Sequence, residues 1–268
     1  MDFRTLEISS PEFEFPGVRQ LTLKSASTGS RVDVSVYIPE AGREQADLPV
    51  LMLLHGVYVS HWSWMMQGGV HQVLEGMIAT GSSKPFVLVM PSDGLWGDGS
   101  GYVAHHGKDF ERLMAIDIPL AVQQCIDQVS DQSTWCISGL SMGGYGALAL
   151  GLKYPDKFKA ISAHSPITAF DNFQPFVEEA WEKQSAGQFE SIYSLLVSKG
   201  AATPLRFDCG KEDTLIKDNI VLHEQMDDMG IPHQFETLEG AHNWAYWHMA
   251  VEKTFAFCTR VIEGRFDG

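Results

Sequence analysis

Short apolar runs alternate with longer helix-like segments along most of the chain. The apolar runs occupy residues 50–54, 86–90, 134–138, 160–163, 205–209 and 233–237. Runs of this length are typical of strands that are covered on both faces. Apolar positions at helical spacing predict helices over residues 110–129, 143–154, 221–229 and 244–261. The alternation predicts an α/β fold with a mostly parallel central sheet and helices on both faces.

The pattern changes at the start of the chain and again before residue 205. Residues 18–24 and 32–38 alternate polar and apolar positions around a turn, which predicts a pair of antiparallel strands. Residues 166–204 carry no strand pattern. An insertion of this length is either a small cap over the active-site edge or an added structural segment that has no role at that edge. We expect one domain over residues 1–268 with a short cap segment at 166–204.

A Gly-x-Ser-x-Gly pentapeptide at residues 139–143 is the strongest chemical signal in the chain. It follows the apolar run at 134–138 and opens a glycine-rich helix, which is the strand–turn–helix setting of a nucleophile elbow. The elbow strains its central residue and needs small neighbours, and glycine occupies both flanking positions. The context predicts Ser141 as a nucleophile. The alternative is a glycine-rich turn without chemistry.

A serine nucleophile needs a base, and in this fold an acid and then a histidine follow the serine along the chain. His242 lies after the last expected strand and directly before the last helix, where the base is expected. The acid candidates are Asp208, Glu212 and Asp213. Asp213 is preferred because it lies in a loop from which it can reach the imidazole. Asp208 lies inside the strand and is alternatively a partly exposed or salt-bridged carboxylate.

An oxyanion hole needs two backbone N–H groups. One is expected from Met142, the residue after the nucleophile. The other is expected from the loop after the first apolar run, with Val57 as the preferred donor and Tyr58 as the alternative. His55 is interpreted as a structural histidine at a strand end and not as a second base.

Tryptophans recur in segments that should meet at the carboxyl edge of the sheet, where ligands bind in open α/β folds. The candidate pocket residues are Trp62, Trp96, Trp181 and Trp244. Their bulk around one serine predicts a short apolar acyl slot and not a long lipid channel. The alternative for each tryptophan is core packing beneath a loop.

Composition narrows the range of partners. The chain has 19 basic and 34 acidic residues and a formal net charge of −15, which disfavours nucleic acid and anionic membranes. No apolar run reaches the roughly 20 residues that cross a bilayer, and the charged N-terminus lacks a signal-peptide core. We expect no nucleic-acid partner, no membrane partner and a cytoplasmic location, while a homo-oligomer stays open.

The residues predict no metal site. The four cysteines are widely spaced, and there is neither a cysteine pair at zinc spacing nor a His-Glu-x-x-His motif. The adjacent His105 and His106 are interpreted as solvated loop residues. Cys136 and Cys209 lie in apolar runs and are interpreted as small buried hydrophobic residues.

The chain resembles the esterase branch of the α/β hydrolases. This branch includes tributyrin esterase-like enzymes, S-formylglutathione hydrolases, feruloyl and acetylxylan esterases and the antigen 85 acyltransferases. The resemblance rests on residues 53–56, 90–94, 139–147, 209–213 and 240–244. It implies the α/β-hydrolase fold, hydrolysis of small acyl esters and no metal or organic cofactor. The family pattern places the acid at the aspartate after Cys-Gly-x-x, which is Asp213 here.

The sequence thus predicts a serine carboxylic-ester hydrolase that acts on short-chain acyl esters through an acyl-enzyme. A thioesterase or an acyltransferase is the alternative, because the triad does not encode the leaving group or the acceptor. A non-catalytic binding protein on a hydrolase scaffold is the third hypothesis. Such proteins normally lose a triad member, and all three are present here.

Overall fold

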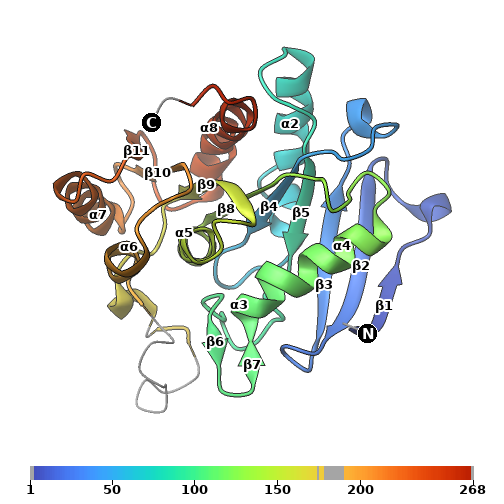
Figure 1. Cartoon of the computed structure of the whole chain (residues 1–268), viewed down its shortest axis with the longest axis horizontal. Helices are drawn as coiled ribbons and strands as arrows, with labels where there is room; N and C mark the ends of the chain where they lie inside the picture. The colour runs from blue at the N-terminus through green and yellow to red at the C-terminus, as the bar shows by residue number, and fades with distance from the viewer. Residues whose placement is uncertain (1–2, 174, 178–189, 267–268) are drawn as a thin grey trace.

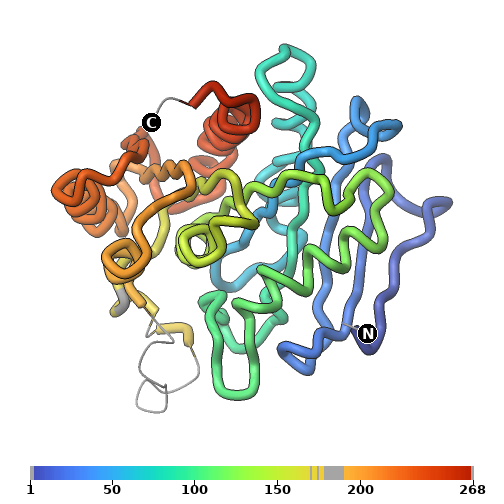
Figure 2. Tube along the Cα trace, in the orientation of Figure 1, coloured from blue at the N-terminus to red at the C-terminus, as the bar shows by residue number. Residues whose placement is uncertain are grey.

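One nine-stranded sheet forms the centre of the computed structural model, which describes residues 3–173, 175–177 and 190–266. Its strands are β1 (Phe3–Ile8), β2 (Val18–Ser25), β3 (Arg31–Tyr37), β4 (Val50–Leu54), β5 (Val87–Pro91), β8 (Trp135–Leu140), β9 (Phe158–His164), β10 (Leu205–Gly210) and β11 (Gln234–Leu238). The strand order is β1-β2-β3-β5-β4-β8-β9-β10-β11. The pairings β1–β2, β2–β3 and β3–β5 are antiparallel, and the strands from β5 to β11 are parallel to one another. Figure 2 shows the chain progressing from the N-terminal strands at one end of the molecule to the C-terminal elements at the other.

Helices cover both faces of this sheet. They are α1 (Ser63–Met66), α2 (Val70–Ala79), α3 (Phe110–Arg112), α4 (Ile118–Cys125), α5 (Met142–Lys153), α6 (Ile192–Lys199), α7 (Ile216–Asp228) and α8 (Trp244–Ile262). Side chains of α1, α2 and α8 form the core on one face, and side chains of α3 to α7 form the core on the other (Figure 1). A two-stranded hairpin of β6 (Ala104–His105) and β7 (Lys108–Asp109) is separate from the main sheet. The predicted α/β-hydrolase architecture is confirmed.

The central strand β4 is apolar throughout because both of its faces are buried. Val50, Met52 and Leu54 pack into the core on one face, whereas Leu51 and Leu53 pack into the core on the other. All five side chains are fully buried. Successive side chains of a strand point to opposite faces, so a strand between two helical layers needs apolar residues at every position.

The helix predicted over residues 110–129 is wrong in two respects. A π-helical turn at Leu113–Asp117 separates α3 from α4, and Ile126 is already extended. Pro119 has no N–H with which to continue the regular hydrogen bonding, and the N–H of Ile118 donates to the carbonyl of Leu113, five residues earlier. The buried Asp117 of this turn accepts hydrogen bonds from the hydroxyls of Ser25 and Ser27, which fastens the turn to the end of β2.

The insertion at 166–204 is only partly described. Its described parts are residues 166–173, 175–177 and 190–204, which include a short 3-10 turn (Phe170–Phe173) and the helix α6. Trp181, a predicted pocket residue, lies outside the described residues. Phe176 is 7% exposed and packs into the core on the α5 side of the sheet.

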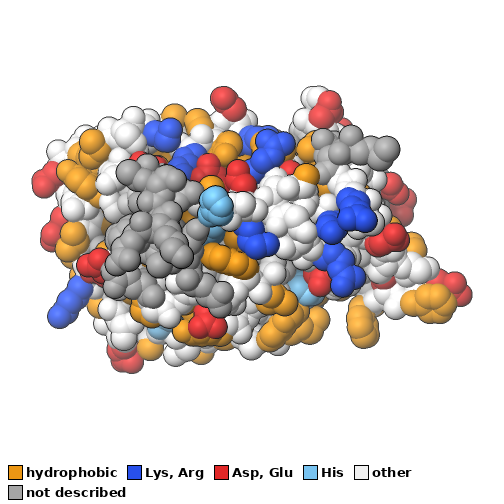
Figure 3. All heavy atoms as spheres, turned by 90° about the horizontal axis from the view of Figure 1, so that it is seen from below, with side chains coloured by type: hydrophobic (Ala, Val, Ile, Leu, Met, Phe, Trp, Pro, Cys, Tyr) orange, Lys and Arg blue, Asp and Glu red, His pale blue; other side chains and the backbone are white. Residues whose placement is uncertain are grey.

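The surface carries charges of both signs. On the face seen in Figure 3, acidic and basic side chains are interspersed with apolar ones, so the net negative charge is not gathered into one patch there.

None of the helices in the described part of the chain is both long and apolar enough to cross a bilayer.

Candidate active site

Ser141 occupies a sharp turn between β8 and α5, with backbone angles φ 56° and ψ −120°. A side chain at Gly139 would place its Cβ 2.1 Å from the carbonyl oxygen of Gly143. A side chain at Gly143 would place its Cβ 2.3 Å from the carbonyl oxygen of Leu54. Both flanking positions therefore require glycine for the turn to close. The strained conformation holds Ser141 at the N-terminus of the buried helix α5.

A continuous chain of hydrogen bonds joins the three predicted triad residues. The Oγ atom of Ser141 lies 3.0 Å from Nε2 of His242, and Nδ1 of His242 lies 2.8 Å from Oδ2 of Asp213. The serine follows β8, the aspartate follows β10 and the histidine follows β11. These strands are parallel, so their carboxyl ends meet at one edge of the sheet. The geometry matches a nucleophile, a base and an orienting acid.

The carboxylate of Asp213 is buried yet stays ionised. Burial raises its pKa, but hydrogen bonds from the His242 imidazole and the Leu215 N–H outweigh this effect, so the pKa lies below its ordinary value. The hydroxyl of Ser165 acts in the same direction. A carboxylate held in this form keeps the histidine proton on Nδ1 and leaves Nε2 free to accept the serine proton.

Asp208, the competing acid, has a different environment. Its carboxylate is fully buried and lies 2.9 Å from Nδ1 of His164 and 2.7 Å from the guanidinium of Arg206. The hydroxyl of Tyr246 donates to its other oxygen. Burial raises the pKa of Asp208, but the charges of His164 and Arg206 and these hydrogen bonds lower it to about 2. The prediction of a salt-bridged carboxylate is confirmed, and the prediction of a partly exposed one is wrong.

The loop after β4 lies beside the nucleophile. A Cβ at Gly56 would lie 3.3 Å from the Cβ of Ser141. The N–H of Tyr58, the alternative oxyanion donor, donates to the carbonyl of Asp98 at 3.4 Å. Within the described part of the chain, the N–H groups of Val57 and Met142 donate no hydrogen bond. They are the two N–H groups that the sequence predicts as oxyanion donors.

The three predicted pocket tryptophans that the structure describes lie in three settings. Trp62 directly precedes α1 and is 40% exposed. Trp96 packs against His105 with the two rings tilted by 51° and their centroids 4.3 Å apart, and it is partly buried. Trp244 begins α8 and meets the buried Trp64 edge to face at 5.7 Å. Of these residues, Trp244 is adjacent to the loop that carries His242.

Two further residues support the triad and were missed from the sequence. The indole of Trp247 packs edge to face on His242, with ring centroids 4.9 Å apart. The indole N–H of Trp247 donates to the hydroxyl of Ser165 at 3.4 Å. Trp247 is three residues after Trp244 on the same helix, so helical spacing was the available signal. Ser165 follows the end of β9 and gave no signal, because only the fold brings it to Asp213.

His55 has the structural role that the sequence predicts. Its ring is buried, and Nδ1 donates to the carbonyl of Gly56 at 2.7 Å. Its Nε2 accepts a hydrogen bond from the N–H of Asp93 at 3.1 Å. Both ring nitrogens are thereby used to fix the loops on either side of the nucleophile.

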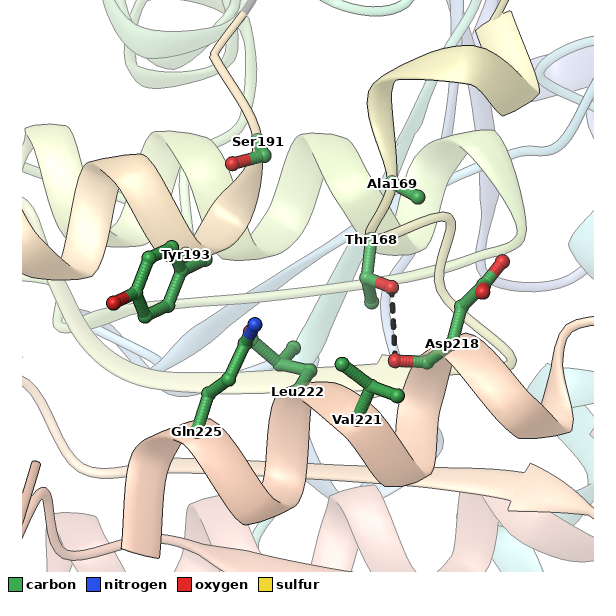
Figure 4. Close-up of a pocket in the computed structure, with 8 residues that line it drawn as sticks. All are labelled: Thr168, Ala169, Ser191, Tyr193, Asp218, Val221, Leu222 and Gln225. Atoms are coloured by element: carbon green, nitrogen blue, oxygen red, sulfur yellow. Dashed lines mark hydrogen bonds between the residues drawn. The ribbon is translucent and has the colours of Figure 1, made fainter. Parts of the chain in front are cut away.

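A separate cavity of about 250 Å³ lies between α6, α7 and the segment that follows β9 (Figure 4). The hydroxyl of Thr168 donates to the carbonyl of Asp218 across it, and the ring of Tyr193 lies at its opposite side. None of the three triad residues lines this cavity. The predicted triad lies elsewhere, at the turn between β8 and α5 and the loops beside it.

Comparison with known proteins places the chain among esterases. Residues 25–257 match the family described as "Putative esterase". The chain is 24% identical over 242 residues to an acetyl esterase of Caldicellulosiruptor saccharolyticus, with 82% of this chain and 86% of that protein covered. A solved structure of a ferulic acid esterase superposes with a TM-score of 0.74 at 26% identity and covers 96% of this chain and 99% of its own.

Some relatives are longer than this chain. An uncharacterised protein of Corynebacterium glutamicum is 25% identical over 240 residues, and the match covers 83% of this chain but 56% of that protein. The family match covers most of the present chain, including the elbow and both other triad segments. The fold and the site define an α/β hydrolase with a nucleophile elbow. The chain belongs to the esterase family that the match describes.

Proposed function

We propose that this protein is a serine carboxylic-ester hydrolase in which Ser141, His242 and Asp213 are the catalytic residues. The observation that carries the proposal is the unbroken hydrogen-bond chain from a strained, buried serine through the imidazole to an ionised aspartate. Neither the pentapeptide nor the histidine alone requires this geometry. The family membership agrees with it.

In the first half-reaction, Oγ of Ser141 attacks the ester carbonyl carbon while its proton passes to Nε2 of His242. The carbonyl oxygen becomes an oxyanion that accepts hydrogen bonds from the N–H groups of Met142 and Val57. Asp213 stabilises the imidazolium through Nδ1. The C–O bond to the alcohol then breaks, and His242 returns the proton to the departing oxygen, which leaves an acyl-serine.

In the second half-reaction, water replaces the alcohol. His242 accepts a proton from the water as it attacks the acyl carbonyl, and the same N–H groups hold the second oxyanion. The proton then returns to Oγ of Ser141, and the carboxylic acid leaves. No residue beyond the triad and the two N–H donors changes its bonding in this cycle, which therefore requires neither a metal nor an organic cofactor.

The leaving group distinguishes the ester hydrolase from a thioesterase with the same triad. Matched oxygen and thiol esters of one acyl group, assayed on one preparation, measure this preference. We expect the higher kcat/KM for the oxygen ester. A higher kcat/KM for the thiol ester would be consistent with the same triad but would make the protein a thioesterase. Labelling of Ser141 by a fluorophosphonate probe is expected in both cases, and its failure would instead support a binding protein without catalysis.

We further propose that the acyl slot is short. Gly99 has no room for a side chain, because its Cβ would lie 2.6 Å from Sδ of Met142 and 3.1 Å from both Val57 and Phe176. Phe176 of the insertion therefore lies close to the side chains of Val57 and Met142, which supports a cap role for the described part of the insertion around this residue. Bulky side chains also pack on the histidine side of the site, where Trp247 contacts the ring of His242 and Trp244 contacts Trp64.

Acetyl to butyryl p-nitrophenyl esters are expected to turn over faster than esters beyond about eight carbons, because each methylene gains about 0.8 kcal/mol only where a slot receives it. Trp96→Ala is expected to shift the kcat/KM ratio toward longer chains. The matched control is Trp135→Ala, which truncates a tryptophan at the amino end of β8 and should leave the ratio unchanged. A kcat/KM that rises steadily to palmitoyl esters in the unmodified enzyme would contradict the short slot and indicate an open groove.

A further inference from the structure

We propose that His223, Asp227 and His233 form a binding site for a transition-metal dication such as Zn²⁺. The sequence predicted no metal site, and the structure brings these three residues together at the junction of α7 and β11. His223 and Asp227 are one helical turn apart on α7, and His233 lies in the short connection to β11. One potential ligand atom from each residue lies within 4.8 Å of the other two.

The two imidazoles face each other directly. Nδ1 of His223 lies 2.8 Å from Nε2 of His233. Two such nitrogens share either one proton or one metal ion, because two lone pairs or two protons at this distance repel. Zinc–nitrogen bonds of about 2.0–2.1 Å would place the two nitrogens about 3.3 Å apart. For the two nitrogens, an ion therefore requires a separation only a few tenths of an ångström larger than the observed one. The carboxylate of Asp227 contacts the other ring nitrogen of His223, at 3.6 Å, and has to turn further to reach the ion.

The ligand histidines are already oriented. Nδ1 of His233 donates to the carbonyl of Ile231 at 2.8 Å, so its Nε2 presents a lone pair to His223. Hydrogen bonding of the second ring nitrogen to a carbonyl is the arrangement found for metal-bound histidines. The ring of His233 stacks on Phe207 at 5.8 Å and that of His223 packs on Phe235 at 4.9 Å. The aromatic neighbours restrict both rings and reduce the ordering that binding would otherwise cost.

The local charges favour a bound cation. Oδ2 of Asp227 lies 3.6 Å from Nε2 of His223 and supplies a negative charge next to the imidazole pair. Both histidines line a surface hollow of about 600 Å³, which Arg206 and Lys253 line as well. Arg206 pairs with Asp208 at 2.7 Å, and Lys253 pairs with Glu236 at 2.8 Å. Their positive charges are thus compensated. Arg260 also lines the hollow and is the remaining cation there.

The donor set selects the kind of ion. Two imidazole nitrogens and one carboxylate suit Zn²⁺, Co²⁺, Ni²⁺ or Cu²⁺, whereas Mg²⁺ and Ca²⁺ prefer oxygen ligands throughout. The partial exposure of both histidines leaves positions for water on the ion. Zn²⁺ and the spectroscopically visible Co²⁺ are therefore suitable probes.

The location assigns the ion a structural role. His233 precedes β11, whereas His242 follows it, so the five-residue strand places about 16 Å between this site and the triad edge. β11 is the edge strand of the sheet, and α7 lies beside it (Figure 1). An ion held by both elements would clamp the end of α7 to this edge. It would stabilise the fold without entering the ester chemistry.

Equilibrium dialysis of the metal-stripped full chain against Zn²⁺ tests the proposal. We expect one equivalent of Zn²⁺ per chain at micromolar free metal, and a rise in Tm when the site is filled. His223→Ala and His233→Ala should each weaken binding by at least about tenfold, since even changes to groups behind the ligands cost 10–100-fold. Co²⁺ should give visible absorption bands that both substitutions remove. Ester hydrolysis without added metal should be unchanged in both variants.

Matched controls separate this cluster from other histidines and acids. His71→Ala removes a half-buried histidine of α2, and Glu224→Gln removes an exposed carboxylate adjacent to His223 on α7. Both should bind Zn²⁺ like the unmodified protein, whereas Asp227→Asn should bind it more weakly. The proposal is overturned by the absence of saturable binding at micromolar Zn²⁺, or by unchanged binding in a folded His223→Ala, His233→Ala double variant.

Discussion

Ser141→Ala is expected to abolish ester hydrolysis, with a loss of about 10⁴- to 10⁶-fold in kcat. The substitution removes the only atom that forms the acyl bond in the proposed cycle, and no neighbouring group can replace it at the elbow. The small alanine side chain fits where serine fits, so the fold should persist despite the positive φ at this position. Kinetics with p-nitrophenyl butyrate measure the loss, and circular dichroism checks the fold.

Ser138→Ala provides a matched control for this experiment. Ser138 lies three residues earlier on β8, is fully buried and, in the described part of the chain, has a hydroxyl without a hydrogen-bond partner. Its removal should leave both kcat and fluorophosphonate labelling close to those of the unmodified enzyme. Retention of more than about a tenth of the activity in Ser141→Ala would exclude Ser141 as the nucleophile, since loss of a triad nucleophile costs orders of magnitude more.

The sequence predicts the parts of this molecule that local pattern determines. Strands buried on both faces, such as β4, must be apolar throughout, and this pattern located all the inner strands within a few residues. The elbow likewise has a local cause, because the close approach of Gly139 and Gly143 to backbone atoms requires glycine at fixed spacing. Both features leave a mark on a short stretch of sequence, even though one of the contacts of Gly143 is with the distant strand β4.

Features that depend on distant contacts were not predicted. Ser165 and Trp247 meet the triad only because β9 and α8 pack beside it. His223 and His233 are ten residues apart at a spacing that resembles no common zinc motif, and the turn after α7 brings them together. The strand β1 and the helix α2 were not predicted at all. Tertiary packing decides all of these features.

Asp213→Asn is expected to lower kcat by about 10⁴-fold while the protein remains folded. An amide at this position can donate a hydrogen bond to Nδ1 of His242, which would move the imidazole proton to Nε2 and leave no lone pair for the serine hydroxyl. It also removes the charge that stabilises the imidazolium. The measurement is kcat for a short acyl ester, with the melting temperature as the check on folding.

Asp208→Asn is the control that distinguishes the two acids, and it should affect stability far more than turnover. The carboxylate of Asp208 is fully buried against Arg206 and His164, so an amide would leave the guanidinium without its closest charge partner. Breaking a buried pair in this way costs about 3–5 kcal/mol.

The ionised Asp208 has a pKa of about 2, below the 3.8 of the free group. Its stabilising contribution is therefore complete above about pH 4 and is lost as the pH falls toward 2. The variant should lose this part of the acid sensitivity, and its folded fraction should keep most of its kcat. A folded Asp208→Asn protein with a 10⁴-fold lower kcat, alongside an active Asp213→Asn protein, would transfer the role of catalytic acid to Asp208.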